Sequence, residues 1–145
     1  MDTSELRIKM CEKAVEIQEL AKYQTGDWFA QATANGKGMG VGVFVYEESY
    51  IFDFVSTPNT LNIRGNPIWL PTQDQLQEMV GAFEPDSLTL QYNFMEWCIP
   101  YFGAKGGAIY LWYEDSKTSM EQLWLAYVMK NLYSKQWNGE DWVKE

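Results

Sequence analysis

The pattern of hydrophobic positions predicts a helix at the start of the chain. Apolar side chains recur there every three or four residues, at Leu6, Met10, Ala14, Ile17 and Ala21. This spacing places them on one face of an α-helix. Asp2 stands three residues before Glu5, which is the spacing of a capping box at a helix start. We therefore expect a helix over residues 3–23.

Two further helices are predicted in the second half of the chain. Thr72 stands three residues before Gln75, and Thr118 stands three residues before Glu121, so both pairs fit a capping box. The first of these helices is expected to end at Gly81. The second is apolar on almost every side, which is typical of a central buried helix. The expected ranges are 72–81 and 119–134.

Alternation of side chains predicts strands between residues 27 and 55. Val41, Val43 and Val45 form one alternating run, and Tyr50, Phe52 and Phe54 form another. Glu47, Glu48 and Ser49 separate the two runs, as in a hairpin connection. We expect an antiparallel sheet from these segments, extended by residues 107–114.

The stretch 87–101 fits two patterns. Leu88, Leu90, Tyr92 and Phe94 alternate as in a strand, whereas Leu88, Tyr92, Met95 and Ile99 have helical spacing. The stretch is long for a strand, so a helix that ends near Pro100 and Gly103 is favoured, and the strand stays an open alternative.

These elements predict one compact domain of the α+β class over residues 1–145. An antiparallel sheet would pack against three to four α-helices in a single domain. The chain has 145 residues, of which 46% are hydrophobic and 16% aromatic, so it can bury a sizeable core without disulfides or metal. Cys11 and Cys98 are expected to be buried, reduced thiols.

Charge is concentrated in the middle of the chain. The formal net charge is −9, and between Gly38 and Ala104 the only cation, Arg64, stands against eight acidic residues. A surface of this sign repels phosphate, so we expect no direct binding to nucleic acid. It can attract a basic protein partner, or it can simply keep the protein dissolved.

Six residues are candidates for contact with a partner. Four are acids in predicted turns, where side chains are commonly exposed, and two are tryptophans that flank an Asn-Gly turn near the C-terminal end. The two tryptophans are expected to be the least buried of the seven, because they lie near the end of the chain. The candidates are Glu47, Glu48, Glu84, Asp86, Trp137 and Trp142.

The sequence offers little for catalysis. It contains no histidine, and it has no pair of acids or cysteines with metal-ligand spacing. The glycines at positions 36, 38, 40 and 42 lead into a strand and not a helix, so they are expected to give room to bulky side chains on the facing strand and not to hold phosphate. We expect no catalytic residue, no metal and no cofactor, and we rank an enzyme that uses carboxylates third among the possible functions.

The remaining sequence signals concern location. The first residues are charged and helical, without the apolar segment of a signal peptide. The longest apolar run, Leu123 to Met129, is far too short to cross a membrane. These signals predict a cytoplasmic protein without a membrane partner.

Three segments resemble a family of small proteins that are encoded by phages and prophages of Gram-positive bacteria. The matching motifs are WLPTQDQLQEM at 69–79, SMEQLWLAYVM at 119–129 and WNGEDW at 137–142. The resemblance covers about a fifth of the chain in its motifs, and it brings no activity, cofactor or catalytic residue. The glycine-rich segment from Gly36 to Val55 lies outside it.

The sequence as a whole favours a non-enzymatic, phage- or prophage-related accessory protein. It would bind a host or phage macromolecule through its acidic surface. The alternative is a small-ligand-binding domain with an aromatic pocket. The identity of the partner and the formation of a homo-oligomer stay open.

Overall fold

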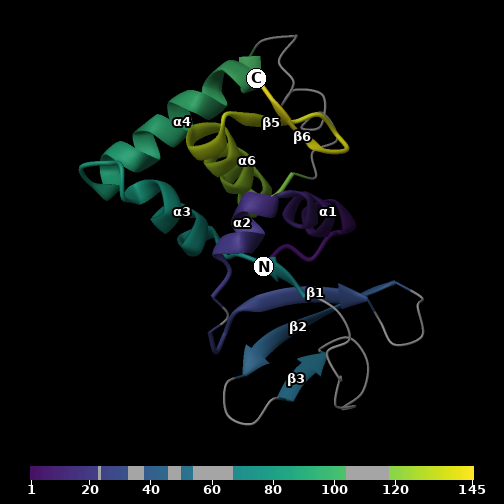
Figure 1. Cartoon of the computed structure of the whole chain (residues 1–145). Coiled ribbons are helices and arrows are strands. Elements are labelled where there is room, and N and C mark those ends of the chain that lie inside the picture. The colour runs from purple at the N-terminus through teal and green to yellow at the C-terminus, as the bar shows by residue number, and fades with distance from the viewer. Residues whose placement is uncertain (23, 33–37, 46–49, 54–66, 104–117) are drawn as a thin grey trace. The chain divides into compact units, whose positions relative to one another are not determined.

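A computed structural model describes residues 1–22, 24–32, 38–45, 50–53, 67–103 and 118–145 (Figure 1). The chain divides into two compact units. One contains residues 3–72, and the other contains residues 1–2 together with 73–145. The predicted α+β class with an antiparallel sheet is confirmed. The expected strand at 107–114 lies outside the described residues, and the single domain over 1–145 stays a prediction.

The predicted N-terminal helix is two helices, α1 (Glu5–Lys13) and α2 (Val15–Leu20). They meet at Ala14, where ψ is 67° and the backbone N–H bonds to the carbonyls of Met10 and Cys11. Gln18 donates a hydrogen bond from Nε2 to the Cys11 carbonyl at 3.0 Å, which gives that carbonyl a second partner beside the break. The first helix also begins differently from the prediction, because Ser4 and not Asp2 caps α1.

The sheet has the strand order β3-β2-β1-β4, and all its pairs are antiparallel. Its strands are β1 (Trp28–Ala32), β2 (Met39–Val45), β3 (Tyr50–Asp53) and β4 (Ile68–Leu70). The first three confirm the predicted sheet of residues 27–55. The fourth was not predicted, because a strand of three residues is too short to show alternation.

The glycines of β2 have the predicted role. Gly42 lies opposite Phe29, and Gly40 lies opposite Gln31, in the register of β1 and β2. Directly paired residues share one face of a sheet, so the missing side chains leave room for the larger ones. Phe29 and Gln31 are both buried.

A glutamine side chain covers the edge of this sheet. Gln18 accepts a hydrogen bond from the Trp69 N–H at 2.8 Å and donates one to the Trp69 carbonyl at 3.0 Å. The amide of Gln18 thus replaces a further strand beside β4, and it blocks one site of edge pairing. The buried Arg7 adds a link through Nη2, which donates to the Pro71 carbonyl at 2.8 Å.

In the second unit, residues 73–103 and 118–145 are described, and they form three helices and a hairpin (Figure 1). Their ranges are α3 (Gln73–Gly81), α4 (Ser87–Gly103), α6 (Met120–Tyr133), β5 (Lys135–Trp137) and β6 (Trp142–Lys144). The predicted helices at 72–81 and 119–134 are confirmed. The favoured helix at 87–101 is confirmed too, and it continues through Pro100 to Gly103.

The start of α6 is built differently from the prediction. Ser119 and Gln122 form the capping box, in place of Thr118 and Glu121. Asp2 accepts hydrogen bonds from the Ser119 hydroxyl at 2.6 Å and from Gln122 Nε2 at 2.8 Å. The acid that was expected to cap the first helix therefore holds the start of a helix more than a hundred residues away in sequence.

The expectation that Trp137 and Trp142 are the least buried tryptophans is wrong, because Trp28 and Trp97 are both more exposed. Only 1% of Trp137 and 6% of Trp142 is exposed. The two residues pair across the hairpin of β5 and β6, and their ring centroids lie 5.1 Å apart. Asn138 and Gly139, whose φ is 101°, make the turn that folds β6 back, and β5 packs against α6. Nearness to the end of the chain does not expose these rings, because the hairpin folds them inward.

Candidate functional site

Helix α4 has two apolar faces. One is buried and contains Leu90, Phe94 and Cys98. The Phe94 ring stacks on Trp124 of α6 with centroids 3.8 Å apart, and Tyr127 meets the Phe94 ring edge-on at 5.4 Å. This packing fixes which side of α4 points inward.

The other face of α4 is exposed. Leu88, Tyr92 and Met95 follow one another at helical spacing, with 83%, 61% and 51% of their surfaces exposed. Phe83, in the turn between α3 and α4, is 77% exposed. We call these four residues the α4 face. Large apolar side chains gathered in this way are typical of an interaction surface.

The sequence that contains the α4 face is acidic. Residues 73–103 contain no lysine or arginine, and the acids of this range are Asp74, Glu78, Glu84, Asp86 and Glu96. Glu84 accepts a hydrogen bond from Asn93 Nδ2 at 2.9 Å. Tyr92 donates its hydroxyl to Glu96, and this bond raises the pKa of Tyr92. The Glu96 carboxylate is therefore held beside Tyr92, and the Glu84 carboxylate is held on α4 through Asn93.

Asp86 also organises the start of α4. Its carboxylate accepts hydrogen bonds from the Thr89 N–H and the Thr89 hydroxyl, both at 2.9 Å. The backbone bond and then the hydroxyl bond lower the pKa of Asp86. The acid therefore remains charged at neutral pH while it caps the helix.

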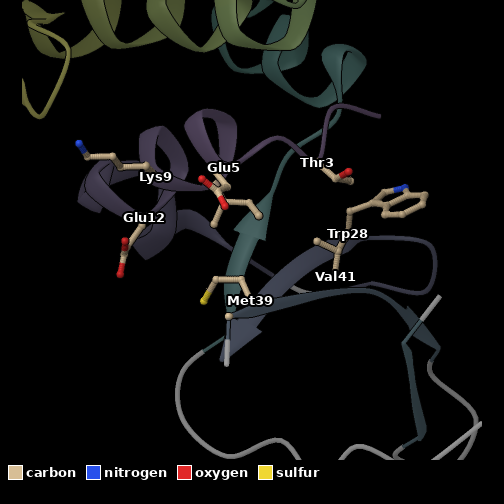
Figure 2. A pocket seen from close by; sticks show the side chains of 9 residues that line it. Thr3, Glu5, Lys9, Glu12, Trp28, Met39 and Val41 are labelled. Carbon is tan, nitrogen blue, oxygen red and sulfur yellow. The ribbon is translucent and has the colours of Figure 1, made fainter. Parts of the chain in front are cut away.

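A groove of about 630 Å³ lies in the other unit, beside α1 and the strands β1 and β2 (Figure 2). Ile8, Trp28, Met39 and Val41 give it an apolar floor, and the other described residues that line it are Thr3, Glu5, Lys9, Glu12 and Gly38. In Figure 2 the Lys9 side chain extends away from Trp28 and Met39. An apolar hollow with a few polar groups is typical of a site for a small molecule.

The structure brings together only part of the predicted site. Glu84 and Asp86 lie next to the α4 face, whereas Glu47 and Glu48 lie outside the described residues. Trp137 and Trp142 are buried in the hairpin and offer little surface. The predicted acids are thus accompanied by apolar residues that were not predicted as contacts.

Sequence reasoning missed the α4 face although its signal was present. The helical spacing of Leu88, Tyr92 and Met95 was recognised, but these residues were not predicted to be exposed or to contact a partner. A helix that is apolar on two opposite sides can bury only one of them in a small unit. The second side is then a candidate contact surface.

The described residues show little catalytic chemistry. Cys98 is buried, and its burial raises the pKa of its thiol from 9.0 to about 11. A thiol of this kind is a poor nucleophile at neutral pH. Within the described ranges, no group of acids and cysteines has the arrangement of a metal site. No helix in those ranges is long and apolar enough to cross a membrane.

Comparisons with family models, curated proteins and solved structures find no match to this chain. The function is therefore inferred from its two surfaces, the α4 face and the groove beside α1.

Proposed function

We propose that this protein is a non-enzymatic, phage- or prophage-related accessory protein of the cytoplasm that binds a basic protein through the α4 face. One observation carries the proposal. The exposed side chains of Leu88, Tyr92 and Met95 form a stripe on a helix whose opposite side is packed into the core. The link to phages depends on the resemblance of the three sequence motifs.

The physical basis of binding is the apolar area of this stripe. Burying apolar surface contributes roughly 25 cal/mol of binding free energy per Å². A large side chain such as leucine or tyrosine contributes most when the partner excludes water from it completely. The packing of Phe94 on Trp124 holds α4 in place before a partner arrives. A rigid surface loses little conformational entropy on binding.

The charge around the face selects the partner. Five carboxylates and no cation in residues 73–103 favour a partner with lysine or arginine beside its own apolar residues. A second copy of this chain would bring acids against acids, which disfavours a homo-oligomer through this face. Phosphate-rich nucleic acid is disfavoured for the same reason.

The test is partner capture from lysate of a Gram-positive bacterium, the host that the resemblance implies, followed by a titration with the purified partner. We compare the wild type with a variant that carries Leu88→Ser, Tyr92→Ser and Met95→Ser. A matched control carries Val15→Ser and Leu20→Ser, two exposed apolar positions of the other unit. We expect the α4 variant to lose at least about tenfold in affinity, equal to 1.4 kcal/mol, and the control to bind as the wild type does.

The result that would overturn the proposal is equal affinity of the wild type and the α4 variant for every captured protein. Circular dichroism and a thermal melt establish that both variants are folded. An acidic captured protein would contradict the choice of a basic partner.

A further inference from the structure

We propose that the groove beside α1 binds a small organic cation with a flat, apolar body. This inference goes beyond the proposed function, because none of the described residues that line the groove belongs to α4. Nothing in the sequence pattern alone marked these residues as a site.

The floor of the groove would hold the apolar body. Met39 is 43% exposed, and Trp28 is half-buried, so each presents apolar surface to the hollow. Ala30 and Ala32 lie on the same face of β1 as Trp28, because side chains two residues apart in a strand point the same way. Their short side chains leave space beside the Trp28 ring.

The wall of the groove favours a positive charge. Glu5, Lys9 and Glu12 lie four and three residues apart on α1, so they share one side of the helix. Among the described residues of the lining, two carboxylates outnumber one ammonium group, and Lys9 extends away from Trp28 and Met39 in Figure 2. A cation near the Trp28 ring also gains from the negative face of the aromatic system.

The size of the groove limits the ligand. Its volume of about 630 Å³ is in the range of small-molecule sites, which is about 300–1,000 Å³. A bicyclic aromatic with a short charged arm fits such a volume. Its flat body can lie on the floor while the charged arm reaches the wall of α1.

Three probes with one shared body test the charge preference. Indole is neutral, tryptamine carries an ammonium group, and indole-3-acetate carries a carboxylate. We titrate each into the full-length, isotope-labelled protein and follow its backbone amide signals by NMR. We expect tryptamine to bind about threefold or more tightly than indole-3-acetate, the size expected for one partly solvated charge interaction. The shifted signals should belong to groove residues such as Trp28 and Met39.

Two variants test the two parts of the groove separately. Met39→Trp fills the floor and should weaken all three probes. Glu5→Gln with Glu12→Gln should bring the affinities of tryptamine and indole-3-acetate together and leave indole unchanged. A control with Glu19→Gln and Glu140→Gln removes the same number of exposed charges outside the groove, so it should keep the wild-type order.

The inference is overturned if no probe shifts the groove signals at millimolar concentration, or if the order of affinities survives in the variant of Glu5 and Glu12. It is separable from the proposed function. The triple serine variant of the α4 face should bind tryptamine with the affinity of the wild type, whether or not its affinity for a protein partner changes.

Discussion

The ring of Phe94 on α4 stacks on the ring of Trp124 on α6, with centroids 3.8 Å apart and planes inclined by 9°. Both side chains are almost completely buried. Tyr127, one turn along α6 from Trp124, approaches both rings edge-on. This aromatic group therefore joins the two helices and turns Leu88, Tyr92 and Met95 outward.

The first prediction concerns the stability of that aromatic group. Trp124→Ala should lower the free energy of unfolding by about 3–5 kcal/mol, because it removes a buried ring and leaves a cavity beside Phe94. The measurement is a urea titration followed by circular dichroism. Tyr92→Ala is the matched control, since its ring is largely exposed, and it should change the free energy by about 0.5 kcal/mol or less. An unchanged midpoint for the Trp124 variant would refute the prediction.

The second prediction concerns salt and partner binding. Glu84→Gln, Asp86→Asn and Glu96→Gln together remove three charges beside the α4 face. Association with the captured basic partner should slow, and its dependence on salt concentration should flatten, because steering by charge weakens. Stopped-flow mixing at low and moderate ionic strength measures both effects. If the wild type and the triple variant associate at the same rate and with the same dependence on salt concentration, the acidic residues serve only solubility.

A third prediction concerns the acid that caps α4. Hydrogen bonds from Thr89 hold the folded-state pKa of Asp86 below its ordinary value of 3.8. A lowered pKa means that the acid stabilises the fold above its ordinary pKa, and that this contribution is lost as the pH falls through the folded-state value. An NMR titration of the Asp86 side chain should therefore give a midpoint below 3.8.

Thr89→Ala supplies the control for this titration. It removes the hydroxyl donor but leaves the backbone donor, so the midpoint should move only part of the way back to the ordinary value. A midpoint above 3.8 in the wild type would show that the capping bonds do not favour the charged form.

The fourth prediction concerns Cys98. Because burial raises the pKa of its thiol to about 11, a thiol reagent should modify it very slowly at pH 8 in the folded protein. Cys11→Ala isolates the signal of Cys98. Denaturant should restore the rate of an ordinary exposed thiol. Fast modification of the folded protein would contradict the assignment of Cys98 to the core.

The same raised pKa has a consequence for stability. The Cys98 thiol has a pKa of 9.0 in the unfolded chain and about 11 in the folded protein. The neutral, buried thiol therefore contributes fully to the stability of the fold below pH 9. That contribution is lost as the pH rises through this window. Cys98→Ala should remove this part of the alkaline loss of stability, and melts between pH 8 and 11 measure it.

Local patterns were sufficient to predict most elements of the fold. The helical spacing before Ala21, the alternation around Val43 and the apolar stretch after Ser119 each depend on residues close together in sequence. Features that depend on distant partners were missed. Strand β4 has three residues, too few to show alternation, and it exists because it pairs with β1 and bonds to Gln18.

The candidate site was predicted in part for a related reason. Composition alone revealed the acids around Glu84 and Asp86. The apolar half of the same surface could not be distinguished from core, because Leu88 and Leu90 are alike in sequence and differ only in which of them is buried. Their opposite exposure follows from the stack of Phe94 on Trp124.

The bonds from Ser119 and Gln122 to Asp2 bear on the order in which the protein can fold during synthesis. The unit of residues 3–72 has its described strands and the helices α1 and α2 as soon as residue 72 has left the ribosome. The other unit joins Asp2 to residues 73–145, so Asp2 must wait until residue 122 emerges before it can bind the start of α6. The unit of residues 3–72 can therefore form while Asp2 still has no partner at the start of α6.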